Sequence, residues 1–393
     1  MLIFDILRYG HGIFFVGLQT CLMGGVFLEW RRDRRACRSA GAMDGGAAGG
    51  GAEPRAKPRA LPLVSVLVPI HNEARRMGGL LQSLALQDYA GAEYIFIDDR
   101  SADESPAMLA HFAEGRRDVK IITLEENPGS NHKQYALGKG IEAARGEFFL
   151  LTDADCELKP GWIRAMVRRM TDGRVGAVIA PVFKKEEGKG FFYSYQCYDH
   201  IIRYIYLAGA AGLGAAGGGF GNNLILRRAC LEAAGGYGAV PPSPTEDAAL
   251  VSRIRAVTTY QVRAAVGLGT HVKTGAEKSW KSLINQTLRW NNGGLFSPEI
   301  LTRINYNLLM IVISTGILAI PLLPFVPGLW PMPLGVLIVM LENTAGALCI
   351  GKSSLPRPRF LWIPELLFTP VYFTLMTLMG YLGIRTDWKG NKI

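Results

Sequence analysis

The 393-residue sequence has few charged side chains and few cysteines for its length. Charged residues make up 19% of the chain, below the roughly 25% that is usual in soluble domains. The six cysteines are scattered and form no Cys-x-x-Cys pair, which excludes a zinc-finger pattern and a disulfide scaffold. No nucleic-acid-binding signature accompanies the net charge of +10, so no nucleic-acid partner is expected. With 49% hydrophobic residues, the composition predicts a chain that is part soluble domain and part membrane.

The first long apolar run covers Gly12–Leu28, close to the lower limit of ~17 residues for a membrane helix. A basic cluster follows it directly, made of Arg31, Arg32, Arg34, Arg35 and Arg38. Because the charges follow the apolar run, a signal anchor with its amino end outside is favoured over a cleaved signal peptide. We therefore expect a membrane anchor over residues 1–30 and a basic, Gly/Ala/Pro-rich linker over residues 31–62.

From Leu63 the sequence alternates between short strands and helices. Strands are predicted at Leu63–Val68, Tyr94–Ile97, Val119–Leu124 and Phe148–Leu151, and helices at Ala74–Gln87, Ala102–Glu114 and Lys133–Ala144. Such alternation predicts an α/β fold with a mostly parallel sheet, here over residues 63–300. Ligands bind at the carboxyl ends of strands in such sheets. The acids found at such ends are Asp98, Asp99, Asp153 and Asp155.

Residues 301–386 return to membrane composition, followed by a short tail over residues 387–393. The apolar runs are Leu308–Phe325, Leu334–Ile350 and Phe360–Ile384, and three helices are expected. Three full crossings after a cytosolic domain would place Arg385, Lys389 and Lys392 outside the cell. That contradicts the positive-inside rule, so one run is expected to be re-entrant or interfacial.

The most informative acidic motif is Asp153-Ala154-Asp155, which follows an apolar strand. Two carboxylates one residue apart can share Mg²⁺ or Mn²⁺, which takes oxygen ligands and bridges substrate phosphates. A loop with two solvated acids is the alternative.

A second acidic motif, Thr245-Glu246-Asp247, precedes a helical segment. Asp247 is a candidate general base for an acceptor hydroxyl. The alternative is that Thr245 caps the helix, with two acids in its first turn.

The third motif places Gln286, Arg289 and Trp290 on one face of a helix. Arg289 is suited to hold a diphosphate, and Trp290 to stack on a sugar or acceptor. An ordinary interfacial helix is the alternative. A separate apolar stripe of Trp280, Leu283, Ile284 and Leu288 is suited to a membrane or a core.

In their order along the chain, these motifs resemble the family-2 inverting glycosyltransferases. The resemblance is to the membrane branch that includes cellulose, hyaluronan and poly-N-acetylglucosamine synthases and ceramide glucosyltransferases. The matching stretches are Val64–Glu73, Asp98–Asp103, Lys133–Glu147, Asp153–Asp155, Thr245–Asp247 and Gln286–Trp290. The resemblance implies a nucleotide-sugar-binding α/β domain of the GT-A type, followed by α-helical transmembrane segments.

The resemblance also implies a role for each motif residue. Donor binding is expected of Asn72, Glu73, Asp98, Asp99, Lys133 and Asp153. Asp155, with Asp153, is expected to hold the metal. Asp247, with Glu246 beside it, matches the catalytic base, and Gln286, Arg289 and Trp290 match the motif beside the diphosphate and acceptor.

The implied reaction is a single in-line displacement with inversion, from a nucleotide-diphosphate sugar, most commonly a uridine diphosphate sugar, to a lipid-like acceptor. A processive polysaccharide synthase that extends a glycan remains an alternative. An inactive nucleotide-sugar-binding subunit and a transporter also remain alternatives. The transporter is favoured only by the intramembrane pair Glu342-Asn343. The aromatic stretch Phe191–Tyr195, with Tyr198, Tyr204 and Tyr206, suits an apolar acceptor or ordinary packing. The expected location is the inner or plasma membrane, multi-pass, with a cytosolic catalytic domain.

Overall fold

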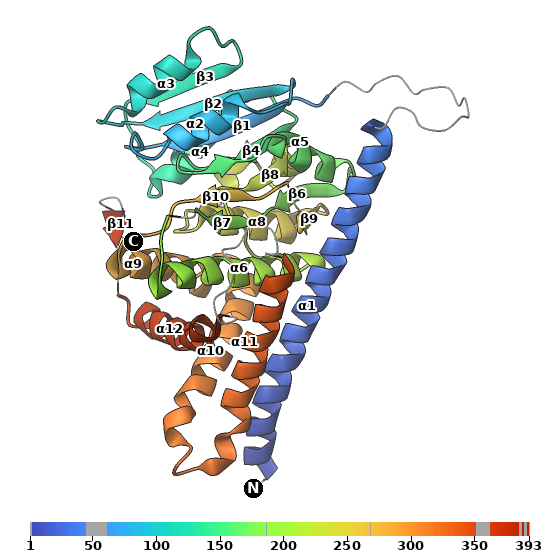
Figure 1. The fold of residues 1–393 in the computed structure, drawn as a ribbon, viewed down its shortest axis with the longest axis vertical. Helices are drawn as coiled ribbons and strands as arrows, with labels where there is room; N and C mark the ends of the chain where they lie inside the picture. Colours follow the sequence, from blue (N-terminus) through green and yellow to red (C-terminus); the bar gives the residue numbers. More distant parts are fainter. Residues whose placement is uncertain are drawn as a thin grey trace, which may run out of the picture.

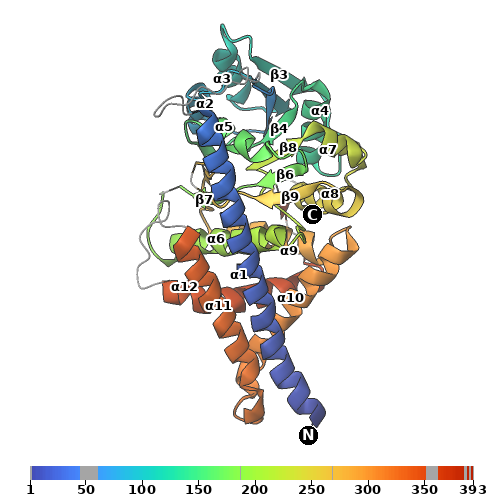
Figure 2. The ribbon, with the colours of Figure 1, turned by 90° about the vertical axis from the view of Figure 1, so that its right-hand side faces the viewer.

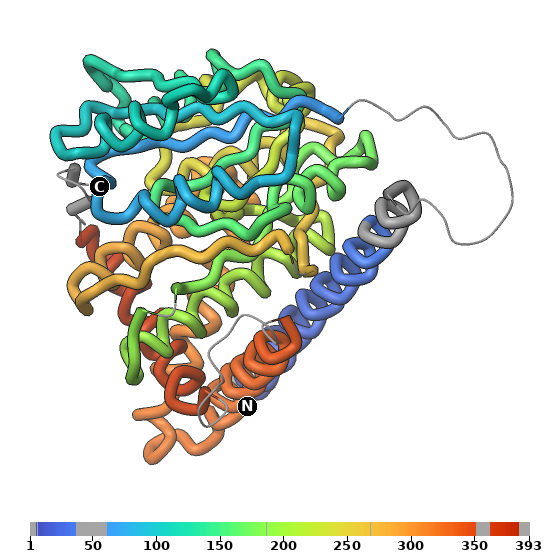
Figure 3. The backbone as a smooth tube through the Cα atoms, turned by 45° about the horizontal axis from the view of Figure 1, so that its top comes forward, coloured from blue at the N-terminus to red at the C-terminus, as the bar shows by residue number. Residues whose placement is uncertain are grey.

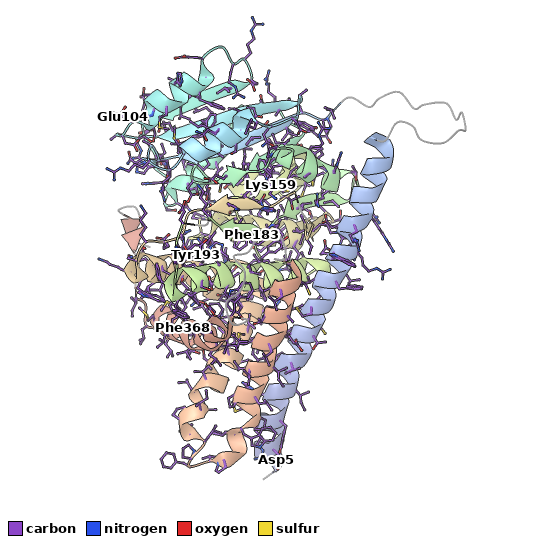
Figure 4. The ribbon with its side chains drawn as sticks, viewed as in Figure 1. Asp5, Glu104, Lys159, Phe183, Tyr193 and Phe368 are labelled. Atoms are coloured by element: carbon purple, nitrogen blue, oxygen red, sulfur yellow. The ribbon has the colours of Figure 1, made fainter. Side chains whose placement is uncertain are left out.

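A computed structural model describes residues 2–44, 61–185, 187–267, 269–350, 362–384, 387–388 and 391–392. These residues form an α/β domain that rests on crosswise helices, below which long helices extend (Figure 1). In Figure 4, Glu104 marks the outer end of the α/β domain and Asp5 the opposite end of the molecule. Half of the predicted linker, residues 45–60, lies outside the described residues, as do Arg385 and Lys389.

The main sheet has seven strands in the order β3-β2-β1-β4-β8-β6-β9. Their bounds are β1 Val64–Ile70, β2 Ala92–Asp99, β3 Val119–Leu124, β4 Phe148–Leu151, β6 Val175–Ile179, β8 Leu224–Arg227 and β9 Gln261–Ala264. Only β8 runs antiparallel to its neighbours in this sheet. The central strands read as continuous apolar runs because helices cover both faces of the sheet. The predicted α/β fold with a mostly parallel sheet is confirmed.

A smaller sheet joins β5 (Glu157–Leu158), β7 (Val182–Lys184) and β10 (Val272–Thr274). Strand β10 pairs antiparallel to β5 and parallel to β7. These strands come from distant parts of the sequence, and their pairing places Lys184 and Thr274 next to the end of β4.

The helices of the α/β domain are α2 (Gly78–Ala85), α3 (Ser105–Ala113), α4 (His132–Ala143), α5 (Trp162–Val167), α7 (Arg228–Ala233) and α8 (Glu246–Val257). The three predicted helices are present, and each begins and ends within a few residues of its expected limits. Helix α2 starts later because residues 73–77 form a turn, in which the amide of Arg76 donates to the carbonyl of Glu73.

Helix α1 is a single helix from Leu2 to Asp44 and therefore extends beyond the predicted anchor. Two acids on its later turns explain the extension. Glu29 accepts a hydrogen bond from the amide of Ala264 at 3.0 Å, and Asp33 pairs with Arg169. The helix is thus held by the edge of the main sheet after it leaves the apolar bundle (Figure 2).

Helix α6 (Phe191–Gly212) crosses α1 at a point where both helices carry glycine. A Cβ atom on Gly25 would overlap the carbonyl oxygen of Gly209, and one on Gly212 would overlap that of Gly25. The close backbone approach therefore requires small residues at this crossing.

Helix α11 (Pro331–Ile350) runs alongside α1 (Figure 3), whereas α10 (Ile300–Leu318) slants away from α1 (Figure 2). Helices α9 (Trp280–Leu295) and α12 (Ile363–Tyr381) lie across that direction, like α6 (Figures 1 and 2). Four helical segments are long and apolar enough to cross a membrane: Leu7–Ala36, Ile300–Leu322, Pro327–Ile350 and Ile363–Tyr381. The expected three carboxyl-terminal helices are present, and α12 is the one that differs in direction.

Helix α12 also explains the apolar stripe of α9. Leu283 and Leu288 are buried against Tyr195 of α6 and against Tyr372 and Met376 of α12. Of the two expected settings for this stripe, membrane and core, these two leucines occupy a core. Phe368 of α12 extends the same cluster beneath α6 (Figure 4).

The pair Glu342-Asn343 of α11 contacts α1. The amide of Gln19 donates to Oδ1 of Asn343 at 2.9 Å, and the hydroxyl of Thr20 donates to Glu342 at 3.3 Å. These polar groups join two helices of the bundle, as polar groups within membranes commonly do.

Candidate active site

A polar cavity lies at the carboxyl ends of β1, β2 and β4. Its lining includes Glu73, Asp99, Lys133, Asp153, Asp155, Glu246, Asp247, Gln286, Arg289 and Trp290. The structure therefore brings together ten of the twelve residues singled out in the sequence, from six separate stretches of chain.

The other two, Asn72 and Asp98, lie outside this lining and shape the neighbouring loops. Asn72 has a left-handed backbone (φ 54°), and its side-chain oxygen accepts from the amide of Ala102 at 2.8 Å. Asp98 is buried and accepts from the amide of Ser101 at 3.3 Å. Their expected contact with the donor therefore stays a prediction.

Glu73 and Asp99 form the end of the cavity next to β1 and β2. Glu73 pairs with Arg76 at 2.6 Å. Asp99 accepts from Nε of Arg100 and from the side-chain amide of Asn127, both at 2.8 Å. The two carboxylates are thus held in place by neighbouring donors.

Lys133 lies between two of the acids. Its Nζ is 2.7 Å from Asp153 and 3.2 Å from Glu246. Burial opposes its charge, but the two carboxylates outweigh burial and raise the pKa of Lys133 above its ordinary value. The lysine therefore stays protonated and neutralises part of the acidic wall.

Asp155 is oriented from the small sheet. The hydroxyl of Thr274 on β10 donates to its Oδ2 at 2.9 Å, and Asp153 lies at the same loop. Within the described part of the chain, no group of three or more His, Cys, Asp and Glu side chains is arranged to hold a metal alone. Asp153 and Asp155 offer two carboxylates, and Mg²⁺ or Mn²⁺ is commonly held by one or two carboxylates together with substrate phosphates.

The charge of the cavity supports the same fit. Its lining contains seven carboxylates (Glu73, Asp99, Asp153, Asp155, Glu246, Asp247, Glu277) and four cations (Arg76, Lys133, Lys184, Arg289). A site with this excess of negative charge repels an anionic diphosphate unless a cation binds with it. A divalent ion at Asp153 and Asp155 would supply that cation.

Asp247 is a buried acid at the start of α8. Its Oδ2 accepts from the amide of Gly221 at 2.6 Å, and its Oδ1 from the amide of Ala248 at 2.8 Å. Burial, followed by the charge of Glu246, raises the pKa of Asp247 to about 6, against the opposing charge of Lys133. A carboxylate with this pKa is suited to take a proton near neutral pH.

Thr245 occupies the position before α8, but its side chain makes no capping hydrogen bond. The alternative in which this motif serves mainly as a side-chain helix cap therefore lacks its defining contact.

Helix α9 presents Gln286, Arg289 and Trp290 to the cavity. The amide of Gln286 donates to Glu277 at 2.9 Å, and Nη1 of Arg289 donates to the carbonyl of Pro244 at 3.0 Å. The Trp290 ring meets His200 edge to face, with centroids 5.4 Å apart. The polar and aromatic groups of this face thus border the same space as Asp247.

The lining residues that were not singled out from the sequence include Lys184, His200, Thr274 and Glu277. Lys184 is fully buried, and burial lowers its pKa despite the nearby charges of Asp155 and Glu277. A lysine that ends an apolar strand, and a histidine in an aromatic helix, were the available sequence signals.

A second cavity, which we call the apolar cavity, lies between α1, α6, α10 and α11. Its walls include Phe15, Leu309, Met310, Ile313, Val339 and Met340. It shares Phe220, Thr245, Asp247 and Trp290 with the polar cavity. Asp247 therefore faces both a polar space and an apolar space within the helix bundle.

The aromatic stretch of α6 contributes little to this wall. Tyr195, Tyr198 and Tyr204 are buried by packing, with the hydroxyl of Tyr198 bonded to Thr344 at 2.8 Å. Tyr206 does line the apolar cavity. Ordinary packing thus accounts for most of the stretch.

Comparisons with known proteins agree with this fold. Residues 65–233 match the family "Glycosyl transferase family 2". A putative glycosyltransferase EpsH from Bacillus subtilis is 31% identical over 43% of this chain and 48% of its own length. A beta-monoglucosyldiacylglycerol synthase from Trichormus variabilis is 26% identical over 44% of this chain and 37% of its own length. The chain thus spans less than half the length of these curated relatives.

Among solved structures, the mannosyltransferase PcManGT from Pyrobaculum calidifontis, in complex with GDP-Man and Mn²⁺, aligns over 94% of this chain and 99% of its own. The TM-score is 0.52 and the sequence identity 19%, which shows a shared fold. The match to glycosyltransferase family 2 over residues 65–233 covers the part of the chain that forms most of the GT-A-like sheet and carries the acids Asp98, Asp99, Asp153 and Asp155 at its strand ends.

Proposed function

We propose that this protein transfers a sugar from a nucleotide-diphosphate sugar to a lipid acceptor at the membrane surface, with inversion. The observation that carries the proposal is the position of Asp247. Its carboxylate borders both the polar cavity and the apolar cavity between the membrane helices. A base in this position can meet a sugar donor from one side and a lipid hydroxyl from the other.

The polar cavity is the proposed donor site. Glu73 and Asp99 lie where the nucleoside is expected, and Asp153 and Asp155 would hold Mg²⁺ or Mn²⁺. The bound ion would offset charge on the departing diphosphate. Arg289 and Lys184 add positive charge to the same space.

Asp247 is proposed to deprotonate the acceptor hydroxyl as the acceptor oxygen attacks the anomeric carbon. Two backbone N–H groups fix the carboxylate, so little reorganisation is needed at the moment of reaction. Trp290 and His200 close the space beside it.

Two observations support a lipid over a growing polysaccharide as acceptor. The wall of the apolar cavity offers few partners for the hydroxyls of a glycan, which are costly to bury without hydrogen bonds. One of the curated relatives is named a beta-monoglucosyldiacylglycerol synthase.

The proposed membrane topology has three crossings, made by α1, α10 and α11. The N-terminus and the loop between α10 and α11 lie at the same far end of the bundle, where Arg8 donates to the carbonyl of Gly328 at 3.1 Å (Figures 1 and 2). That loop, residues 319–330, contains no charged residue, whereas Lys352, Arg357 and Arg359 follow α11 in the sequence. This distribution obeys the positive-inside rule with the catalytic domain in the cytosol.

Helix α12 is proposed to lie in the membrane interface. One side packs on α9 and α6, and the other exposes an apolar stripe of Ile363, Leu367, Val371, Leu375 and Leu378. A helix that lies in the interface without crossing the membrane leaves Arg385, Lys389 and Lys392 in the cytosol. This removes the conflict with the positive-inside rule. Reporters active only in the cytosol, fused at the carboxyl end, should be active, and a carboxyl end found outside would show that α12 crosses.

The first test uses full-length protein in lipid nanodiscs with a lipid extract. Release of nucleotide diphosphate is measured with UDP-glucose, UDP-N-acetylglucosamine and GDP-mannose, with Mg²⁺ or Mn²⁺, and the product is sized. We expect one donor to give a discrete glycolipid. Asp247→Asn should abolish transfer and keep donor binding, whereas the exposed control Glu142→Gln should change neither.

A long polymer as product would favour the processive synthase instead. Donor binding without turnover on any lipid would favour an inactive subunit. Normal turnover of Asp247→Asn would show that another group is the base.

A further inference from the structure

The apolar cavity has little charge where it meets Asp247. Among its described lining residues, the charged side chains are Arg203 and Asp247. Nε of Arg203 donates to Asp199 at 2.8 Å, and both side chains are largely buried. The guanidinium also lies 4.8 Å from the ring centre of Phe373 and 5.3 Å from that of Trp290. Arg203 is therefore already neutralised by an acid and packed between rings.

An anionic acceptor group at this point would meet negative charge. Asp247 lies at the junction of the two cavities, with the Glu246 carboxylate next to it in the chain. Lys133, which pairs with Glu246, also pairs with Asp153, so its charge is shared between these acids. Because the site is buried, the repulsion between Asp247 and a phosphate would be weakly screened.

Lipid alcohols and lipid phosphates differ in whether they need a base to act as acceptors. An alcohol must lose its O–H proton as its oxygen bonds to the anomeric carbon. The bond from that carbon to the diphosphate oxygen then breaks, the electron pair leaves with the diphosphate, and Asp247 holds the proton. A lipid phosphate is already ionised near neutral pH and attacks without a base.

On the basis of the proposed function, we propose that the acceptor is an uncharged lipid alcohol and that lipid phosphates are excluded. The hydroxyl lies against Asp247, and the hydrocarbon part fills the apolar cavity between α1, α10 and α11. Phe15, Met310 and Val339 in the cavity wall supply apolar contacts for the hydrocarbon chain of the lipid.

The first experiment compares matched pairs of lipids in phosphatidylcholine nanodiscs that contain the full-length protein. The pairs are diacylglycerol with phosphatidic acid, ceramide with ceramide 1-phosphate, and a long-chain alkanol with its phosphate. We expect at least one alcohol to be glycosylated at least 10-fold faster than its phosphate. A phosphate used as fast as its alcohol, or faster, would overturn the inference but leave a lipid glycosyltransferase in place.

Glycosylation of a soluble glycan and of neither member of any pair would instead contradict the lipid acceptor itself. The proposed lipid acceptor and the proposed alcohol acceptor would then both be wrong, and the glycosylated product would show that the acceptor is a glycan.

The second experiment locates the acceptor. Ile313 is buried in the wall of the apolar cavity, and Ile311, on the opposite face of α10, is 48% exposed. Ile313→Trp should raise the KM for the alcohol at least 10-fold without changing donor binding, and Ile311→Trp should change neither. If Ile313→Trp also loses donor binding, Met340→Phe in the same wall takes its place. A variant that binds donor normally and keeps the original KM would show that the acceptor lies elsewhere.

Discussion

The Oδ2 atom of Asp247 accepts a hydrogen bond from the backbone amide of Gly221 at 2.6 Å. Gly221 ends a glycine-rich loop that begins after α6, and Asp247 lies in the first turn of α8. The donor is a backbone N–H, so the contact holds the proposed base without using a side chain at position 221. It also limits which residues fit at position 221.

Gly221→Ala is expected to displace the base. A Cβ atom there would lie 3.0 Å from both Cβ and Oδ2 of Asp247, so the carboxylate must move by a few tenths of an ångström. We expect kcat to fall about 10- to 100-fold, since misplacement of a catalytic group by ~1 Å can cost 100-fold. Steady-state kinetics in nanodiscs would measure this.

Gly173→Ala is the matched control, because a Cβ atom there meets no atom within 4 Å. Equal kcat for wild type and Gly221→Ala would indicate that this contact does not position the base.

The activity should depend on the ionisation of Asp247. Burial and the charge of Glu246 raise its pKa to about 6, and the base must be ionised to act. We therefore expect kcat/KM to fall as the pH decreases through about 6. Below the ordinary aspartate pKa of 3.8, Asp247 is protonated in both the native and the unfolded state, and the tighter native binding of this proton stabilises the fold in full. Between 3.8 and about 6 the unfolded chain loses the proton first. The contribution of this group to stability is thus lost as the pH rises through 6.

Glu246→Gln provides the test of cause. Removing the neighbouring negative charge should lower the pKa of Asp247 and move the acidic limb of the profile to lower pH. A limb that stays in place in this variant would assign the titration to another group.

The acids at the strand ends were predictable because the signals are local. Alternation of short apolar strands and helices predicts a parallel sheet, and such a sheet gathers the carboxyl ends of its strands at one edge. Asp99 and Asp153 reach the cavity in this way. The charge of the carboxyl tail likewise predicts that one apolar run does not cross, and this topology stays a prediction.

The remaining features depend on contacts between distant parts of the chain. Thr274 meets Asp155 only because β10 pairs with β5 and β7. Helix α1 extends past the predicted anchor because Glu29 and Asp33 bind groups more than a hundred residues away. The apolar cavity combines α1 with α10 and α11, and no local pattern reports such a combination.

Metal binding should require Asp155. We expect Asp155→Asn to weaken the Mn²⁺-dependent binding of nucleoside diphosphate at least 10-fold, because a neutral amide replaces one of two carboxylate ligands. Calorimetry with and without Mn²⁺ would measure it.

Asp172→Asn is the control, since Asp172 is an exposed acid that pairs with Arg174. If Asp155→Asn binds the diphosphate with unchanged metal dependence, the ion is held elsewhere.

The contact between α1 and the catalytic domain should contribute strongly to stability. Asp33 and Arg169 are both buried, with Nη2 of Arg169 2.9 Å from Oδ2 of Asp33. Asp33→Ala leaves a buried guanidinium without its acid, which typically destabilises a protein by about 3–5 kcal/mol. We expect a clearly lower thermal midpoint in detergent.

The double variant Asp33→Leu, Arg169→Met separates charge from packing. Because replacing a buried ion pair by apolar side chains is often neutral, it should regain most of the lost stability. Asp172→Ala, which breaks an exposed pair, should cost less than about 1 kcal/mol. A thermal midpoint of Asp33→Ala equal to that of Asp172→Ala would mean that α1 is held to the domain by its apolar contacts with α6 and α11 instead.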